Sequence, residues 1–102
     1  MRTISDRERT YSLVLPRRDD IRIEIMDEHL QPGKPKPQFE ILECDVAGYL
    51  LAGSLVLEIE GEKKQTLRTG DAFYIHKGKR HRGYATGNVP ARLITVCYPP
   101  SY

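Results

Sequence analysis

The sequence has few of the features that mark membrane proteins, disulfide-rich proteins and polyanion-binding proteins. Its two cysteines, Cys44 and Cys97, are too few for a disulfide framework or a close-spaced zinc pair. No apolar run approaches the roughly 18 residues that a membrane span requires, and residues 1–9 lack the apolar core of a signal peptide. The formal net charge is only +2. We therefore expect a reduced, cytoplasmic protein that needs neither a membrane nor a polyanionic partner.

A length of 102 residues suits one domain with a single core. Apolar residues make up 39% and charged residues 29% of the chain, which is typical of a globular protein. Residues 1–10 are charged, and we expect an N-terminal arm there that is either flexible or paired as a strand. Residues 11–102 are then expected to form one β-barrel domain.

Short runs rich in Val, Ile, Leu, Tyr and Thr alternate with Gly, Pro and Asp, and no segment after residue 10 has a sustained helical period. Residues 21–25 alternate apolar and charged side chains, which predicts a half-buried strand, and Gly61-Glu62 predicts a hairpin turn. About nine short strands at this spacing favour an all-β sandwich or barrel. The predicted strands are residues 11–15, 21–25, 39–45, 49–52, 55–60, 63–67, 73–75, 82–85 and 92–98.

The stretch from Gly70 to His81 is the most informative part of the sequence. It contains a Gly-Asp turn, a short apolar strand, a second turn at Gly78, and a histidine at the start of the next strand. A small barrel places a polar group in its mouth by such an arrangement. Asp71 is expected to fix its turn by accepting backbone N–H groups rather than to act in catalysis.

With these elements placed, residues 33–99 resemble the cupin family. The resemblance implies a small jelly-roll β-barrel, also called a double-stranded β-helix. Two differences stand out, because His76 replaces the proline of the family's second motif and Ala85 replaces an Asn. The resemblance rests on Gly53 and Gly61, the run Leu67-Arg68-Thr69-Gly70-Asp71, then Ile75, Gly78 and His81, followed by Arg92-Leu93-Ile94-Thr95-Val96 and Pro99.

The resemblance also implies where metal ligands would stand. The family's first motif supplies a His-x-His pair and a Glu about seven residues before the first hairpin glycine; counting back from Gly53 gives Val46, and residues 39–45 contain no histidine. His81 alone stands at a ligand position, and one imidazole cannot hold a divalent transition metal. We therefore expect no cofactor. A substitute ligand set around His81 is the alternative, drawn from His76, Glu40, Glu43, Cys44 and Asp45.

The leading functional hypothesis is a non-enzymatic domain that binds a small molecule and acts as a sensor or regulator. The chain resembles the effector-binding cupin domain at the C-terminus of certain helix-turn-helix transcription regulators, on Arg7-Glu8-Arg9, Pro32-Gly33 and Tyr98-Pro99-Pro100. No helix-turn-helix lies within these residues, so either the chain stands alone or its DNA-binding part is not present. The expected ligand-binding residues are His81, Tyr49, Tyr74 and His76.

Two other functions stay open. The first is a metal-dependent cupin enzyme, of the dioxygenase or isomerase type, with a rearranged site around His81. The second is a barrel that serves only for dimerisation. A homodimer is expected in every case, because the edge strands of an open barrel need covering.

The run from His76 to Arg82 carries four permanent positive charges, which would suit a phosphate or an acidic ligand. The aromatic platform of a single-strand binder is not apparent, and the remaining charge is balanced. We expect a solvated rim and no direct nucleic-acid binding. Cys44 and Cys97 are expected to be buried strand residues that act as small hydrophobes.

Overall fold

The computed structural model describes residues 2–5, 9–16, 18–33 and 39–100. Within these ranges the chain forms ten strands and no helix. The strands are β1 (Arg2–Ser5), β2 (Arg9–Leu13), β3 (Glu24–Leu30), β4 (Glu40–Ile41), β5 (Asp45–Ala52), β6 (Ser54–Ile59), β7 (Gln65–Arg68), β8 (Ala72–Ile75), β9 (Arg80–Ala85) and β10 (Ala91–Tyr98).

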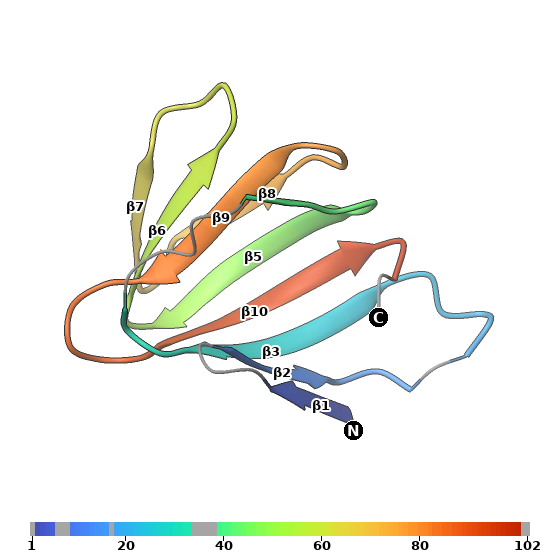
Figure 1. Ribbon diagram of the computed structural model, residues 1–102. Coiled ribbons are helices and arrows are strands. Elements are labelled where there is room, and N and C mark those ends of the chain that lie inside the picture. Colours follow the sequence, from blue (N-terminus) through green and yellow to red (C-terminus); the bar gives the residue numbers. More distant parts are fainter. Residues whose placement is uncertain (1, 6–8, 17, 34–38, 101–102) are drawn as a thin grey trace.

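The strands form two antiparallel sheets whose inner faces enclose the core (Figure 1). The larger sheet has the order β1-β2-β3-β10-β5-β8, and the smaller has the order β4-β9-β6-β7. Part of the N-terminal arm, β1, pairs with β2 at the edge of the larger sheet. The prediction of an all-β jelly-roll barrel is confirmed.

The core consists of aliphatic side chains from both sheets together with Cys44 and Cys97. Both cysteines are free and at most 1% exposed, which confirms that they are buried. Cys97 lies in β10 as predicted, but Cys44 lies in the bend between β4 and β5 and not in a strand. In the described part of the chain, no helix has the length and apolar character needed to cross a membrane. The other buried core residues are Leu13, Met26, Leu30, Val46, Leu50, Leu55, Leu57, Ile59, Leu67, Ile75, Ala85, Ala91 and Leu93.

The prediction for residues 21–25 is wrong in position and in phase. Strand β3 begins only at Glu24, and the residues on its inner face are Glu24, Met26, Glu28 and Leu30, all of them buried. Ile25 lies half-buried on the opposite face. Alternation distinguishes the two faces of a strand but does not say which face is buried. Here both faces carry apolar residues, and pairing with β2 and β10 decides which of them faces the interior. Two glutamates therefore enter the interior.

The segment from residue 39 to residue 52 also differs from the prediction. Within the predicted strand at 39–45, only Glu40–Ile41 and Asp45, the first residue of β5, lie in strands. Gly48 lies inside β5 rather than between two strands. The ring of Phe73 explains this glycine, because a Cβ at position 48 would lie 2.2 Å from Cζ of Phe73. Glycine is used inside a strand where another group must approach the backbone closely.

The predicted hairpin turns agree with the structure better than these two predicted strands do. The turn predicted at Gly61 joins β6 to β7, and the amide of Glu62 donates to the carbonyl of Ile59 at 3.0 Å. The turn between β5 and β6 requires Gly53, whose φ of +82° is unfavourable for other residues. A Cβ there would lie 2.7 Å from the carbonyl oxygen of Pro90. The glycines of the family resemblance thus have direct structural roles.

Candidate functional site

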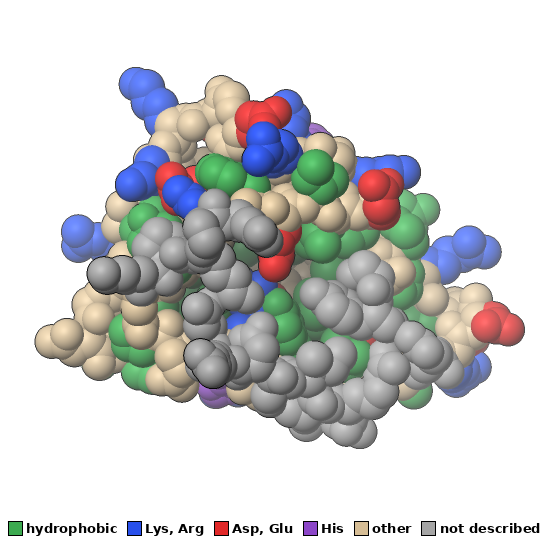
Figure 2. Space-filling model, in the orientation of Figure 1, with side chains coloured by type: hydrophobic (Ala, Val, Ile, Leu, Met, Phe, Trp, Pro, Cys, Tyr) green, Lys and Arg blue, Asp and Glu red, His purple; other side chains and the backbone are tan. Residues whose placement is uncertain are grey.

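The two sheets enclose a cavity of about 70 Å³, and one of its lining residues, Glu40, is exposed. Most of its lining is apolar, and the polar lining residues are few. Figure 2 shows acidic and basic side chains among hydrophobic ones near the centre of this view. The volume admits a small ligand, or one end of a larger ligand. The cavity is lined by Arg9, Tyr11, Met26, Glu28, Leu30, Glu40, Leu42, Val46, Leu55, Leu57, Phe73, Ile75, His81, Gly83, Leu93 and Thr95.

A buried polar cluster crosses the inner face of the larger sheet. The Thr95 hydroxyl of β10 donates to Oε2 of Glu28 on β3 at 2.5 Å, although the two residues are 67 positions apart. Nε of Arg9, on β2, lies 4.0 Å from Oε1 of the same carboxylate. Arg9 also donates from Nη1 to the hydroxyl of Tyr11, whose position directly opposite Glu28 is set by the β2–β3 register. Three neighbouring strands therefore bring one cation, one carboxylate and two hydroxyls together.

Burial shifts the pKa values of the ionisable groups in this cluster. Loss of hydration raises the pKa of the Glu28 carboxyl, against the opposing effects of Arg9 and of the hydrogen bond from Thr95. Burial lowers the pKa of Arg9, but its interactions with Tyr11, Glu28 and Glu40 outweigh this effect, so that pKa is raised. Arg9 is a permanent cation, and Glu28 is a carboxylate held in an environment that disfavours its charge.

His81 and Glu40 supply the polar groups of the opposite wall. They face each other as a β4–β9 pair, and His81 is only 7% exposed while Glu40 is open to solvent. Nδ1 of His81 lies 3.2 Å from the carbonyl oxygen of Lys79. Since a carbonyl oxygen only accepts, this contact assigns the proton to Nδ1 and leaves Nε2 of a neutral ring as an acceptor.

Of the four ligand-binding residues predicted from the sequence, only His81 lines the cavity. Tyr49 and Tyr74 are each 49% exposed, on the outer side of the larger sheet. Tyr74 donates to Oδ2 of Asp45 at 2.6 Å, and its ring meets that of the exposed His76 edge-on at 4.9 Å. The structure brings Tyr74 and His76 together with Asp45 but apart from His81. Their role in ligand binding stays a prediction.

The residues at the expected metal-ligand positions do converge, but they do not form a metal site. Val46 and His81 line the same cavity, and Val46 has no donor atom. The guanidinium of Arg9 lies near Glu28 and would repel a cation placed beside that carboxylate. Among the described residues, no group of three or more His, Cys, Asp or Glu side chains is arranged to hold a metal ion. This donor set therefore does not fit the family's metal, and we derive no chemistry from it.

The substitute ligand set is dispersed. Cys44 is buried in the core, Glu43 is exposed, and Asp45 is occupied by Tyr74 and by the amide of Lys77, which donates at 2.8 Å. These hydrogen bonds, with that of Tyr74 first, lower the pKa of Asp45. Only Glu40, of the five residues considered, shares the cavity with His81.

Two further motifs have structural partners. Oδ2 of Asp71 accepts the backbone N–H of Arg68 at 2.9 Å, which confirms the prediction that this carboxylate fixes its turn. In the basic run from His76 to Arg82, Arg80 pairs with Glu60 at 3.3 Å and Arg82 with Glu58 at 2.6 Å. The ring of Phe39 lies beneath both guanidiniums, at 5.3 and 4.5 Å. Part of the positive charge is thus compensated by neighbouring carboxylates.

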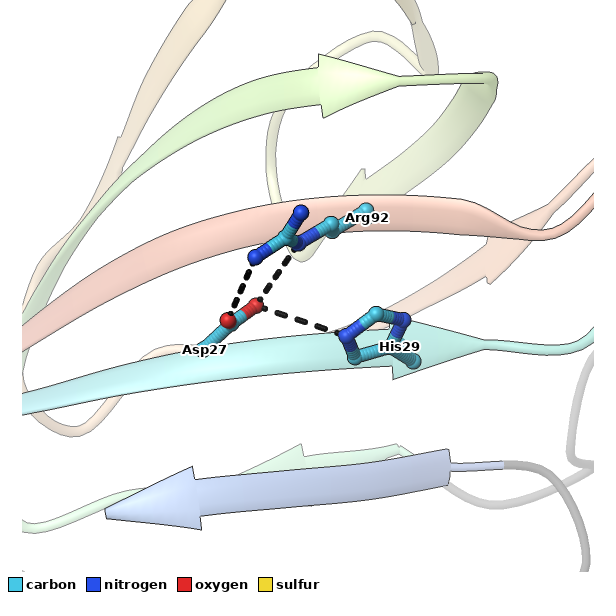
Figure 3. A network of polar contacts seen from close by, with 3 residues as sticks. All are labelled: Asp27, His29 and Arg92. Atoms are coloured by element: carbon cyan, nitrogen blue, oxygen red, sulfur yellow. Dashed lines mark hydrogen bonds and ion pairs between the residues drawn. The ribbon is translucent and has the colours of Figure 1, made fainter. Parts of the chain in front are cut away.

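The outer side of the larger sheet carries a separate polar network (Figure 3). Arg92 of β10 donates two hydrogen bonds to the carboxylate of Asp27 of β3, of 3.1 Å from Nε and 2.8 Å from Nη2. His29 lies on the same strand as Asp27, with Nε2 3.6 Å from its Oδ1. The hydrogen bond from Arg92 is the main cause of a lowered pKa for Asp27. This network links β3 and β10, and none of its three residues lines the cavity.

Sequence reasoning missed Arg9, Tyr11, Glu28 and Thr95. The available signal was weak: Met26 and Leu30 share the spacing of two with Glu28, and Arg9 shares it with Tyr11 and Leu13. The more regular alternation at residues 21–25 points to the opposite phase. No local pattern connects these positions to Thr95.

Comparisons with known proteins agree with the fold described above. The family model described as "Cupin domain" matches residues 26–97. The chain is 44% identical over 70 residues to the Tetracenomycin polyketide synthase protein TcmJ of Streptomyces glaucescens, a match that covers 69% of this chain and 46% of TcmJ. The chain thus spans slightly less than half of that relative's length.

Solved structures share the fold at low sequence identity. KdgF from Halomonas sp. is similar with a TM-score of 0.80 at 20% identity, over 99% of this chain and 90% of that one. Ectoine synthase from P. lautus is similar with a TM-score of 0.82 at 17% identity, over 97% of this chain and 70% of that one. At such identities the similarity shows the fold alone.

Proposed function

The chain belongs to the cupin family, and we propose that it binds a small molecule in the cavity between its two sheets, as a sensor or regulatory domain rather than as a metal-dependent enzyme. The proposal is carried by one observation, the buried cluster of Arg9, Glu28 and Thr95 that faces a largely apolar cavity. A ligand pocket typically combines apolar walls with a few placed polar groups.

Stability alone does not account for this cluster. Replacement of a buried ion pair by apolar side chains of similar size often leaves a protein equally or more stable. Glu28 nevertheless lies at 6% exposure, with Thr95 donating to one carboxylate oxygen and Arg9 near the other. The remaining acceptor sites of Glu28 and the groups of His81 and Glu40 are suited to contact a ligand.

The names of the relatives do not fix the function, because a fold carries many activities. One relative is named as a polyketide synthase protein and one structural neighbour as an ectoine synthase. The name of the polyketide synthase protein is a reason to include polyketides among the compounds tested. The cytoplasmic location, the homodimer and the absence of direct nucleic-acid contact belong to the same proposal.

The test is a thermal-shift screen of the purified chain against sugars, amino acids, aromatic acids and polyketides, with hits measured by calorimetry. A binding protein gains stability in proportion to the logarithm of ligand concentration above its Kd. We expect at least one class of compound to raise Tm in a saturable manner. No response across all classes would contradict the proposal.

A cavity-filling variant shows whether a hit binds in the cavity. Gly83 lines it, and a Cβ there would make ordinary contacts of 3.6 to 3.7 Å with Val56, Leu55 and Leu57. Gly83→Val adds two methyl groups beyond this Cβ, and circular dichroism and Tm verify that the variant is folded. It should lose the ligand, while Tyr84→Phe, on the outward side of the same strand, should retain it. Equal binding by both variants would place the ligand elsewhere.

The alternative, a metal-dependent dioxygenase or isomerase, has a separate test. Protein purified without a metal-affinity tag is analysed for transition metals and then titrated with iron(II), manganese(II), nickel(II) and zinc(II). We expect substoichiometric metal and no saturable binding that depends on His81. Stoichiometric metal that is lost in His81→Ala would favour the enzyme.

A further inference from the structure

The charges around the cavity restrict what the ligand can be. One guanidinium, Arg9, and two carboxylates, Glu28 and Glu40, line the same space, together with the imidazole of His81 and the hydroxyl of Thr95. Glu40 comes from the smaller sheet, yet its charge acts on both Arg9 and Glu28. The charged groups of the two walls therefore gather at one part of the cavity.

We propose that the ligand is uncharged and carries hydroxyl groups on an apolar body, an inference that rests on the proposed function. Among the described lining residues Arg9 is the one permanent cation, and it lies 4.0 Å from the buried Glu28, so these two charges compensate each other. A ligand anion would meet the carboxylates of Glu28 and Glu40. A ligand cation would compete with Arg9 for Glu28 and would place two positive charges beside one buried carboxylate. A charged ligand therefore loses hydration without meeting an uncompensated opposite charge in the buried part of the cavity, whereas a neutral ligand needs no such partner.

Hydrogen-bond complementarity selects the hydroxyl. Ionised carboxylates only accept, so a ligand group that contacts Glu28 or Glu40 must donate. The guanidinium of Arg9 only donates, so a ligand group that contacts it must accept. A hydroxyl is the smallest neutral group that does both. Small size matters because the cavity measures only about 70 Å³.

The remainder of the lining selects an apolar body. Leu30, Leu55, Leu57 and Leu93 contribute aliphatic surface, and Phe73 contributes a ring that rests on the bare backbone of Gly48. A fully hydroxylated ligand would lose hydrogen bonds against these walls. The favoured compound thus has a polar end and an apolar end.

Four three-carbon probes test the inference by ligand-observed NMR titration at neutral pH: propan-1-ol, propionate, propylamine and 1-chloropropane. Their size is nearly constant and suits a cavity of about 70 Å³, so charge and hydrogen bonding are the main differences. We expect propan-1-ol to bind at least about tenfold more tightly than each of the others. Gly83→Val should abolish the signal, and Tyr84→Phe should keep it.

The Glu28→Gln variant provides a second, opposite test. It keeps the shape of the side chain but removes one negative charge, so Arg9 faces the cavity with less compensation. We expect propionate to gain about tenfold in affinity in this variant, while 1-chloropropane is unchanged. Circular dichroism and Tm verify that the variant is folded.

The outcomes separate the two proposals. Tighter binding of propionate, propylamine or 1-chloropropane than of propan-1-ol to the native chain, blocked by Gly83→Val, would overturn the ligand class and leave the cavity as a binding site. Unchanged propionate affinity in Glu28→Gln would overturn the charge argument in the same way. Absence of binding by all four probes, or binding that Gly83→Val leaves intact, would overturn the inference and count against the proposed site.

Discussion

Thr95→Val tests the buried cluster most directly. Valine has nearly the same shape as threonine, and Thr95 is only 2% exposed, so the substitution removes a hydroxyl without opening a cavity. The lost interaction is the 2.5 Å hydrogen bond to Oε2 of Glu28. Glu28 is then left as a buried carboxylate with one fewer donor.

The expected cost follows from the charge of the acceptor. A hydrogen bond to a charged group contributes about 1.5–3 kcal/mol to stability, compared with about 0.5–1.5 kcal/mol for a neutral pair. A loss of about 2 kcal/mol lowers Tm by roughly 8–16 °C in a domain of this size. Thr66→Val, at an exposed position in β7, is the matched control and should change little.

The pH dependence of this cost has a definite sign. Burial raises the pKa of Glu28 in the folded state above its unfolded value, so the folded protein binds the additional proton in the window between the two values. Stability contributed by this group therefore falls as pH rises through the window. At acidic pH, where Glu28 is protonated, the effect of Thr95→Val should shrink to that of a neutral hydrogen bond.

Urea unfolding of the native chain and the variants at neutral and acidic pH measures these quantities. In a Glu28→Gln background, Thr95→Val should cost only about 0.5–1.5 kcal/mol. A cost that is the same at both pH values, or the same with and without the Glu28 carboxylate, would refute the reasoning, because the hydroxyl would then stabilise something other than the charged form of Glu28.

Three further predictions concern other parts of the molecule. Gly48→Ala should cost about 1–3 kcal/mol because its Cβ displaces the ring of Phe73, and the loss should be smaller in a Phe73→Leu background; equal losses in urea unfolding of both backgrounds would contradict the contact. Asp27→Asn should cost at most about 1 kcal/mol at neutral pH, since Asp27 and Arg92 are partly exposed. Because Arg92 lowers the pKa of Asp27, this contribution is present above the usual Asp range and disappears as pH falls through the lowered pKa; a difference from the native chain that persists in acid would argue against it. Sedimentation equilibrium should give the mass of a homodimer, and the mass of a single chain at all concentrations would reject that expectation.

The sequence predicted the architecture well because glycine and alternation act locally. The turns at Gly53, Gly61 and Gly70 and the alternation of Leu55, Leu57 and Ile59 depend on residues close in the chain, and the structure places them as expected. The position of His81 in the interior also followed from its local motif.

Of the candidate site, the sequence predicted His81 and, within the substitute ligand set, Glu40. Tyr49 and Tyr74 were expected at the ligand because an aromatic ring with a polar tip suits a small molecule. The side chain of a tyrosine in a strand can, however, lie on either face of the sheet. Their strands pair so that both rings lie on the outer side of the larger sheet. No property of the residues themselves distinguishes that side from the inner one.

By itself, the sequence determined a small all-β barrel with a histidine in its interior and with free, buried cysteines, because these follow from turn chemistry and from short-range patterns. Only the tertiary structure decided that Glu28 faces inward and that Arg9, from the N-terminal side of the barrel, and Thr95, from its last strand, lie beside it. The physical reason is that alternation defines the two faces of a strand, while burial of one face is decided by neighbouring strands that are distant in the sequence.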